Sequence, residues 1–277
     1  MTGQLYVVAT PIGNLGDFSP RGASVLEQVD FIAAEDTRVT MKLLNHLGLK
    51  KPMVSYHRHN FDVSGQHILS RLLSGESCAL VSDAGTPAIS DPGEELVLLC
   101  RQHGVPITSV PGPCAFVAAL TLSGLSTGRF TFEGFLAMNK KNRRAHLLSL
   151  QQETRTMVFY EAPHKLRATL GDLARCFGES RPVTLCRELT KLHEEVIPTT
   201  LGEAVLYYET QVPKGEFVLV LEGAPKREPE PCSIEDALAL VFAGRADGLS
   251  LKEAARQAAE QTGLSKNELY AAALKAE

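Results

Sequence analysis

Residues 78–93 read CALVSDAGTPAISDPG, an apolar run that passes directly into a loop of small and turn-forming residues. A short apolar run bounded by turn residues is typical of a buried β-strand. Glycine in the loop lets the backbone come close to a ligand, and proline stiffens the loop, so that little ordering entropy is lost on binding. We therefore expect a buried strand that ends at a binding edge carrying Asp83 and Asp91.

The same pattern recurs along the first part of the chain. Short, mostly β-rich runs alternate with segments of about helix length, and they cover residues 5–10, 31–35, 53–56, 77–82 and 107–110. Such alternation predicts parallel strands joined by right-handed crossover helices. Helix-end signals agree, because Ser19 and Asp91 each precede a proline and Gly48 is placed to end a helix. For this reason we interpret Asp91 as a structural helix cap in preference to a ligand-binding residue.

The later part of the chain predicts a second α/β domain and a helical tail. Strands are expected over residues 130–135, 156–161, 182–190 and 216–222, with helices around 144–150, 164–176 and 201–208. Residues 224–232, APKREPEPC, hold three prolines and mixed charges, which are typical of an exposed linker. Ser233, Ser250 and Ser265 each precede an acidic residue by three places, as in a helix capping box. The predicted domains are α/β over 1–125, α/β over 126–224, a linker over 225–232 and small all-helical over 233–277.

The composition limits the class of protein. The chain has 277 residues, a formal net charge of −4 and no apolar stretch near the ~18 residues needed to cross a bilayer. Its first residues, MTGQLYVVAT, lack the basic flank and cleavage site of a signal peptide, so we expect a cytoplasmic protein without membrane contact. The six cysteines form no CxxC pair, which favours free thiols and indicates no structural metal site.

A distinctive loop follows each of the first five predicted strands. In an open parallel sheet such loops gather beyond the carboxyl ends of the strands, where ligands bind. They read TPIGN (10–14), EDTR (35–38), HRHN (57–60), DAGTP (83–87) and PGPC (111–114). The phosphate-binding motifs GxxxxGK[ST] and GxGxxG are not among these loops, so the sequence does not indicate a binding site for a nucleoside triphosphate or a dinucleotide. Carboxylates at this edge favour a phosphate-free ligand that carries positive charge or ribose hydroxyls.

Several longer motifs carry a family resemblance. In order along residues 5–223 the chain contains LYVVATPIGNLGD, AAEDTR, VSDAGTPAISDPG, VPGPCAFVAALTLSGL, FYEAPHKL, RELTK and KGEFVLVLEG. With these motifs it resembles the ribosomal RNA 2′-O-methyltransferases of the tetrapyrrole methylase superfamily. The resemblance implies two α/β domains with S-adenosylmethionine in the cleft between them, a homodimer, and methylation of a cytidine 2′-hydroxyl in the decoding region of small-subunit (16S) rRNA, either free or in the 30S particle.

The chain also departs from the tetrapyrrole-modifying branch of that superfamily. Those members usually carry a GxGPG-type turn after the first strand and a GDP triplet after the fourth, whereas this chain has TPIGN at 10–14 and DAG at 83–85. We take these differences as the mark of the rRNA branch. Donor contacts therefore cannot be carried over from the tetrapyrrole branch residue by residue.

The resemblance implies donor-binding residues in both α/β domains. From the first domain the expected residues are Pro11, Gly13, Asp83, Ala84, Gly85, Thr86, Pro87, Pro111, Gly112, Pro113, Cys114 and Ala115. From the second domain we expect a lid over the donor made by Tyr160, Glu161, Arg187, Glu188 and Phe217.

Methyl transfer to a ribose hydroxyl also needs a base or a strong electrostatic aid, because a hydroxyl is a poor nucleophile. The candidate side chains are Glu35, Asp36, Glu161, Glu188 and Lys191. For any one of these residues the simpler interpretation is a structural ion pair, such as Glu188 with Arg187 or Lys191. Our hypothesis is that Glu35 or Asp36 lies beside the acceptor hydroxyl.

A basic segment is the first candidate for contact with RNA. Residues 134–152 contain no acidic residue, and Lys140, Lys141, Arg143 and Arg144 stand within five positions. Cations of this kind neutralise backbone phosphates, although a basic loop ahead of a solvated helix is a common alternative. The histidines at 57 and 59 form a second, weaker candidate patch for RNA. We do not expect a metal site there, because no carboxylate or cysteine stands at ligand spacing from them.

The helical tail leaves a second class of function open. Residues 251–275 have the spacing of a helix-turn-helix, but residues 233–277 hold five Lys or Arg against seven Asp or Glu, which is unlike a DNA reader. We therefore expect a packing or substrate-docking domain. The alternatives to an rRNA methyltransferase are a methylase of a small tetrapyrrole or corrin and a non-enzymatic nucleic-acid-binding regulator.

Overall fold

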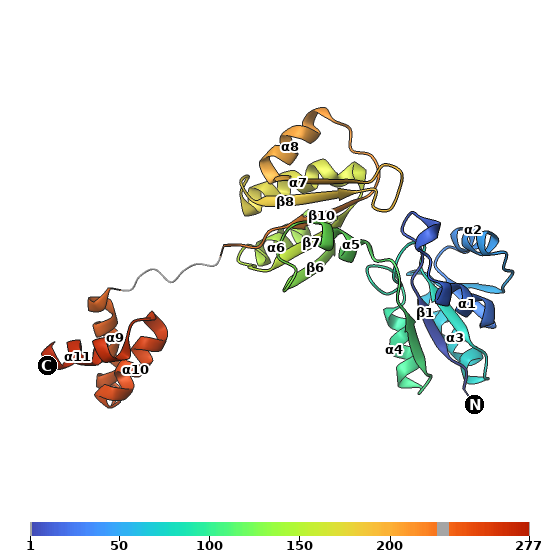
Figure 1. Cartoon of the computed structure of the whole chain (residues 1–277). Helices are drawn as coiled ribbons and strands as arrows, with labels where there is room; N and C mark the ends of the chain where they lie inside the picture. The colour runs from blue at the N-terminus through green and yellow to red at the C-terminus, as the bar shows by residue number, and fades with distance from the viewer. Residues whose placement is uncertain (1, 226–232, 277) are drawn as a thin grey trace. The chain divides into compact units, whose positions relative to one another are not determined.

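A computed structural model describes residues 2–225 and 233–276 of the chain. The chain divides into two compact units, residues 1–224 and 225–277 (Figure 1). Residues 226–232, which make up nearly all of the predicted linker and include Cys232, lie outside the described residues. The five described cysteines are free thiols. No helix within the described residues is long and apolar enough to span a membrane.

The first sheet of the larger unit is parallel throughout. Its strands are β1 (Leu5–Val8), β2 (Phe31–Ala34), β3 (Met53–Ser55), β4 (Cys78–Val81) and β5 (Ile107–Val110), in the spatial order β3-β2-β4-β1-β5. The connecting helices are α1 (Pro20–Gln28), α2 (Thr37–Leu47), α3 (Phe61–Leu73) and α4 (Glu94–Gln102). The five predicted strands and their parallel arrangement are confirmed. Their carboxyl ends, and the loops that follow, therefore lie along one edge.

Alternation along the strands divides the first core into two faces. Phe31 and Leu80 pack with side chains of α3 and α4, whereas Ile32 and Val81 pack with side chains of α1 and α2. Because both faces are covered, β2 and β4 are buried at every position. This explains why the strands appear in the sequence as continuous apolar runs without a polar alternation.

The second sheet of the larger unit is mixed. Its strands are β6 (Phe130–Phe135), β7 (Thr156–Glu161), β8 (Pro182–Arg187), β9 (Glu195–Thr200) and β10 (Phe217–Leu221), in the order β6-β7-β10-β8-β9. Only β6 and β7 are parallel, and β10 pairs antiparallel with both β7 and β8. The helices are α5 (Ala115–Leu122), α6 (Lys140–Ser149), α7 (Pro163–Phe177) and α8 (Leu201–Thr210).

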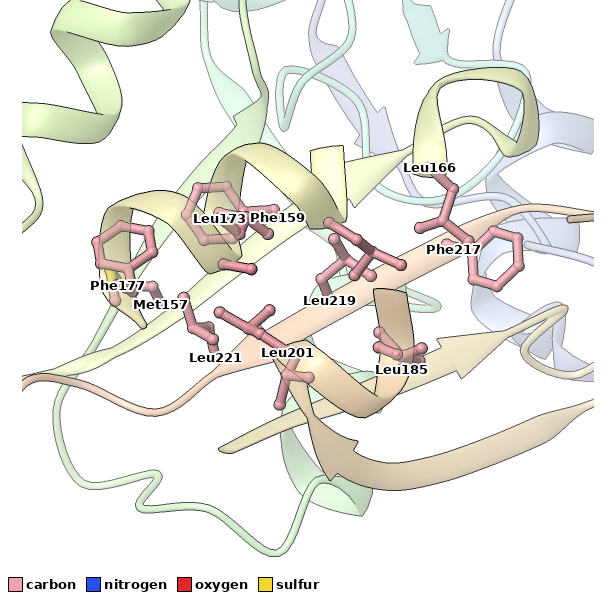
Figure 2. Close-up of a cluster of buried hydrophobic side chains, with 14 of the residues drawn as sticks. Met157, Phe159, Leu166, Leu173, Phe177, Leu185, Leu201, Phe217, Leu219 and Leu221 are labelled. Carbon is pink, nitrogen blue, oxygen red and sulfur yellow. The ribbon is translucent and has the colours of Figure 1, made fainter. Parts of the chain in front are cut away.

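The core of the second sheet centres on β10. All five residues of β10 are buried, and on one face they pack with α7 and α8 in the cluster shown in Figure 2, which includes Phe159, Leu173 and Leu219. On the other face Val218 and Val220 pack with side chains of α5. Full burial of such a side chain contributes about 1.5–3 kcal/mol, so β10 anchors the whole second sheet.

Two sequence expectations differ from the structure. Strand β9 was not anticipated; it is the edge strand of the second sheet, and Pro198 inside it weakens the strand signal because proline is tolerated only at an edge. Asp91 is not a helix cap either. Helix α4 begins at Glu94 and its N-cap residue is Gly93, with φ of 144°. The chain needs this glycine to turn into the helix, which displaces the helix start beyond the Asp-Pro pair.

The smaller unit is a bundle of the helices α9 (Ile234–Ala246), α10 (Leu251–Thr262) and α11 (Lys266–Ala276). The side chain of Ser233 accepts a hydrogen bond from the backbone of Asp236, and Ser250 forms a complete capping box with Glu253. Apolar residues on one side of α10, among them Ala254 and Ala258, are buried against the neighbouring helices.

Candidate functional site

A cavity of ≈ 360 Å³ opens at the carboxyl edge of the first sheet and is closed by residues from the second sheet. Most of its wall is apolar, and no lysine or arginine is among the described residues that line it. Three carboxylates reach it, from Asp91, Glu161 and Glu216. A pocket of this size and composition suits a small ligand that bears positive charge and lacks phosphate.

Hydrogen bonds between neighbouring loops fix the wall contributed by the first sheet. Thr10 and Gly85 form an isolated antiparallel bridge, with N–H···O distances of 2.8 and 3.1 Å. The Thr86 hydroxyl donates to the carbonyl of Pro113 at 3.0 Å. These bonds tie the loops after β1, β4 and β5 together, so the wall is formed before any ligand arrives.

The segment from Gly85 to Gly93 holds an unusual backbone conformation. Ala88 and Ser90 have φ of 66° and 68°, and the two flanking glycines have φ of 87° and 144°. Positive φ is costly for residues with a side chain, and such strain clusters at functional sites. A Cβ on Gly93 would also lie only 2.9 Å from Leu80 Cδ2. The strained segment is the one that turns Asp91 toward the cavity.

The second sheet supplies the opposite wall. The Tyr160 hydroxyl accepts a hydrogen bond of 3.1 Å from the backbone N–H of Phe116, the second residue of α5. Burial raises the pKa of this phenol, so it is neutral under all physiological conditions. Glu161 is 3% exposed and accepts hydrogen bonds from the Ala162 N–H and the Thr169 hydroxyl. Both side chains are therefore fixed in position.

About half of the predicted donor-binding residues line this cavity. Those that do are Ala84, Gly85, Thr86, Cys114, Ala115, Tyr160, Glu161 and Phe217. The sequence reasoning did not select Ile12, Ile89, Ser90, Phe135, Ala162, Pro163, Cys186, Leu189, Glu216 and Val218, which line it as well. Most of these are apolar or small, and nothing in their sequence setting separates a cavity wall from a core.

Pro11 and Asp83 lie on a second cavity of ≈ 140 Å³, next to Thr40 and Lys42. This second cavity is adjacent to the first. The Thr10 hydroxyl contacts Ser82, which lines the second cavity, and Gly85, which lines the first. The remaining predicted donor residues, Gly13, Pro87, Pro111, Gly112, Pro113, Arg187 and Glu188, line neither of these cavities.

The larger unit has two lobes, one built on the first sheet and one on the second. Gly13 and Glu188 belong to a contact between these two lobes. A Cβ on Gly13 would lie 2.4 Å from Lys191 Cγ and 2.9 Å from Thr190 Oγ1, so the loop after β1 packs directly on the 188–191 turn. Lys191 donates to Glu188 at 2.8 Å and to Glu216 at 3.0 Å. The expected ion pair of Glu188 with Lys191 is thus present. These residues hold the lobes in register around the cavity.

Arg187, the other predicted lid residue of this turn, is also engaged in the protein. Its Nε donates to the carbonyl of Lys214 at 2.6 Å, and its Nη1 pairs with Glu195 at 2.9 Å. The prediction that it binds the donor stays a prediction.

The two predicted catalytic carboxylates lie in different electrostatic settings. Hydrogen bonds from the Arg38 guanidinium lower the pKa of Asp36 to about 2, and its carboxylate also caps α2. Burial raises the pKa of Glu35, although its carboxylate accepts a weak hydrogen bond of 3.4 Å from the Asp83 N–H. Asp36 is therefore a poor proton acceptor, and Glu35 the better one.

Asp91 has the most perturbed carboxyl at the cavity. Burial, reinforced by the negative charge of Glu35, raises its pKa to about 6, and a hydrogen bond with Ser82 only partly offsets this. Perturbed carboxyl groups of this kind concentrate at functional sites. The sequence did not predict that Asp91 lines the cavity, because an Asp-Pro pair is also typical of the start of a helix.

The tetrapyrrole (corrin/porphyrin) methylase model matches residues 4–205, almost the whole of the larger unit. The chain belongs to the tetrapyrrole methylase family. Methyl transfer is the activity of this family, and the chain is a methyltransferase. A second model, described as the RsmI C-terminal HTH domain, matches residues 235–277, so the helix-turn-helix spacing found in the tail is confirmed.

Curated relatives of this tetrapyrrole methylase cover nearly its full length. A Synechocystis protein named ribosomal RNA small subunit methyltransferase I is 48% identical over 99% of both chains. Proteins of the same name from Xylella fastidiosa Temecula1 and Escherichia coli O157:H7 are 47% and 45% identical, over 97% and 98% of this chain and 98% and 95% of theirs.

Solved structures share the fold of the methylase at lower identity. A cobalt precorrin-4 methyltransferase of cobalamin biosynthesis superposes with a TM-score of 0.59 at 19% identity, covering 78% of this chain and 94% of that one. A uroporphyrin-III C-methyltransferase from Thermus thermophilus, complexed with S-adenyl homocysteine, gives 0.56 at 19% identity, over 79% and 97% of the two chains. The predicted two-lobed α/β architecture with a helical tail is confirmed.

The basic segment of the methylase, residues 134–152, contains the whole of α6. Lys140, Lys141 and Arg144 are exposed. Arg143 is not: its side chain is 12% exposed, pairs with Asp172 at 2.5 Å and donates to Thr169 at 2.9 Å. Three of the four predicted RNA-binding cations therefore face solvent, and the fourth holds α6 against α7.

Proposed function

We propose that this chain transfers a methyl group from S-adenosylmethionine to small-subunit rRNA. The observation that carries the proposal is that relatives named ribosomal RNA small subunit methyltransferase I are 43–48% identical to it over nearly its whole length. At that identity and coverage the two α/β lobes and the helical tail are shared together, which favours a shared substrate. The tetrapyrrole methylases of known structure align at only 17–20% identity and over 78–79% of this chain, which makes a tetrapyrrole the less favoured acceptor.

The cavity fits the donor chemically. S-adenosylmethionine carries a sulfonium and an ammonium against one carboxylate and has no phosphate, which agrees with a wall that has three carboxylates and, among its described residues, no basic side chain. When bound, it supplies a methyl group activated for attack by a nucleophile. Tyr160, Glu161 and the loops after β4 and β5 would hold it, and the apolar wall would exclude water from the reacting atoms.

The acceptor we propose is the 2′-hydroxyl of a cytidine in the decoding region of 16S rRNA. This finer assignment rests on the family resemblance of the sequence motifs. In-line alignment of the hydroxyl oxygen with the methyl carbon supplies much of the rate, because correct orientation is worth about 7–11 kcal/mol. Proton removal from the hydroxyl must accompany it, and the hypothesis that Glu35 or Asp36 assists there stays a prediction.

The exposed cations on α6 provide a surface for the RNA backbone. Lys140, Lys141 and Arg144 are free of acidic neighbours in the sequence, and phosphate neutralisation by such residues supplies sequence-independent affinity. Replacing these three with serine should weaken rRNA binding and flatten its dependence on salt, while the affinity for S-adenosylmethionine stays unchanged. Arg58, in the loop after β3, is a further exposed cation, on the first lobe.

We also propose that the chain acts in the cytoplasm as a homodimer. The first proposal follows from the location of ribosomal subunits, and the second from the family resemblance. Light scattering of the purified protein tests the oligomeric state: a mass of twice the chain supports it, and the mass of a single chain at micromolar concentration contradicts it.

Mass spectrometry of rRNA tests the function directly. Small-subunit rRNA from a strain that lacks the gene should miss one ribose methyl group on a cytidine, and purified protein with S-adenosylmethionine should restore it on isolated 30S particles. Unchanged rRNA methylation in the deletion strain contradicts the proposal. Calorimetric titration with S-adenosylmethionine separates any methyltransferase from a nucleic-acid-binding regulator, because the regulator should give no heat of binding.

A further inference from the structure

We propose that Thr169 and Arg143 are positioning residues for the methyl donor, because a chain of directed hydrogen bonds from them holds the Glu161 carboxylate at the cavity. This role deepens the proposed function and rests on it, since it takes S-adenosylmethionine as the ligand of the cavity. The sequence placed Arg143 among the RNA-binding cations, whereas the structure gives it partners on α7.

Glu161, the last residue of β7, is a buried carboxylate at the cavity wall. It is 3% exposed, and none of the ion pairs within the described part of the chain includes it. Burying such a group costs free energy unless hydrogen bonds satisfy it. One oxygen accepts from the Ala162 N–H at 2.9 Å and the other from the Thr169 hydroxyl. Because a carboxylate can accept about four hydrogen bonds, Glu161 keeps lone pairs for a ligand.

The hydroxyl of Thr169, on α7, has a fixed direction. Thr169 is 1% exposed, and its Oγ1 accepts a hydrogen bond of 2.9 Å from Nη2 of Arg143. A hydroxyl has a single proton, and that of Thr169 is donated to Glu161. A hydroxyl that accepts from a cation is polarised and donates more strongly. The charge of Arg143 therefore acts on Glu161 through one neutral hydroxyl.

Arg143 is itself held by α7. Its Nε donates to Asp172 at 2.5 Å, and Asp172 also pairs with Arg175. Asp172 stands three residues after Thr169, so the two side chains lie on the same face of the helix. The flat guanidinium reaches both of them with separate N–H groups, which the ammonium of a lysine cannot reproduce. Arg143 is thus fixed in the orientation that the Thr169 hydroxyl requires.

This arrangement favours a ligand-binding role for Glu161 over a purely structural one. If Glu161 served only to pack α7 on the sheet, apolar side chains in place of the charged groups would serve at least as well. Instead Arg143 stands one hydroxyl away, and no lysine or arginine is among the described residues that line the cavity. A donor with positive charge therefore meets a carboxylate that no cation of the cavity wall neutralises directly.

Calorimetric titration of Thr169 variants with S-adenosylmethionine tests the role of the hydroxyl. Thr169→Val removes it at nearly constant volume and should raise the dissociation constant about tenfold or more. Thr169→Ser retains the hydroxyl and should stay within about threefold of wild type. Thr184→Val is the matched control: Thr184 is 2% exposed and donates to the Ser123 carbonyl at 2.8 Å, away from the cavity, so this variant should bind the donor normally. Urea denaturation verifies that each variant folds.

Arg143→Lys tests the other end of the chain of hydrogen bonds. The substitution retains the charge but loses the two-pronged contact with Thr169 and Asp172. It should weaken donor binding about as much as Thr169→Val does, while the salt dependence of rRNA binding stays that of wild type.

A double-mutant cycle separates positioning through Glu161 from a general loosening of the lobe. Glu161→Gln should weaken donor binding, and adding Thr169→Val to it should cause less than about twofold further loss, because the hydroxyl acts only through the carboxylate. S-adenosylhomocysteine, which has the ammonium but not the sulfonium, locates the contact. An equal loss for both ligands assigns it to a group that they share, and a loss confined to S-adenosylmethionine assigns it to the sulfonium; both results support the proposal.

Four outcomes overturn the role of Thr169 and Arg143. Thr169→Val or Arg143→Lys binds the donor within about threefold of wild type; Thr169→Ser binds as weakly as Thr169→Val; the losses from Glu161→Gln and Thr169→Val add in full; or Thr184→Val loses as much affinity as Thr169→Val. Absence of binding heat with the wild-type protein is a different result, because it contradicts the proposed function itself.

Discussion

Replacing Asp91 with asparagine should make the protein more stable, and the gain should depend on pH. Burial raises the pKa of this carboxyl from 3.8 to about 6 in the folded chain. The folded state therefore binds the proton more tightly than the unfolded state, and stability falls as pH rises from about 4 to about 6. Above this window the full penalty of holding an ionised Asp91 is present, and asparagine removes it.

The size of the gain follows from the shift. Two pKa units correspond to about 3 kcal/mol, at about 1.4 kcal/mol per unit. Asp91 is only partly buried, and solvent screening of the carboxylate reduces this figure by at least half. We therefore expect Asp91→Asn to raise the free energy of unfolding by about 1–1.5 kcal/mol at pH 7.5 and by close to zero near pH 4.

Urea denaturation across this pH range measures the effect. The midpoint concentration should increase for Asp91→Asn with an unchanged m-value. Asp30→Asn is the matched control of opposite sign, because hydrogen bonds from the Ser77 N–H and hydroxyl lower the pKa of Asp30. That variant should lose stability at pH 7.5, and the loss should shrink as pH falls below about 4. A stability of Asp91→Asn equal to or below wild type at pH 7.5, or a difference independent of pH, refutes the reasoning.

Three further substitutions test the contacts around the cavity. Gly13→Ala places a Cβ 2.4 Å from Lys191 Cγ and should lower the unfolding free energy by about 1–3 kcal/mol in urea titrations; Gly128→Ala, where an added Cβ meets nothing within 4 Å, should change little. Tyr160→Phe removes the hydrogen bond with the Phe116 N–H of α5 and should cost about 1 kcal/mol of stability and weaken calorimetric donor binding; unchanged donor affinity would contradict its assignment to the wall. Arg143→Ser should destabilise the protein by about 1–3 kcal/mol yet leave the salt dependence of rRNA binding intact, and a flattened salt dependence would show that it contacts RNA instead.

The first lobe could be predicted from the sequence because its strands are buried on both faces. Four-residue apolar runs bounded by turn residues, such as β2 and β4, are typical of strands buried on both faces, and the loops after parallel strands share one edge. The second lobe was harder because its edge strand β9 exposes one side and contains Pro198. The local sequence of β9 is therefore only weakly typical of a strand, and its pairing with β8 stabilises the strand conformation.

The candidate site shows the same division. Loops with several glycines and prolines identified one wall, including Gly85 and Thr86. The opposite wall is built partly from residues such as Cys186 and Val218, whose side chains belong equally to the core of the second sheet. Only the packing of the lobes decides that they face a cavity. Asp91 was wrongly interpreted as a helix cap because an Asp-Pro pair is compatible both with a cap and with a carboxylate that faces a cavity. The structure distinguishes the two, because the N-cap residue of α4 is Gly93, with φ of 144°.

The order of strands in the second sheet has a consequence for how the enzyme is made. Strand β10 lies between β7 and β8, which do not pair with each other, yet it is the last strand of the lobe to be translated. Until it emerges from the ribosome, β6 with β7 and β8 with β9 are separate two-stranded pieces, which are marginally stable alone. Phe217 and Val218 arrive on the strand that joins these pieces. Completion of the lobe and completion of the cavity are thus one event, and a nascent chain that stops short of it cannot sequester the methyl donor.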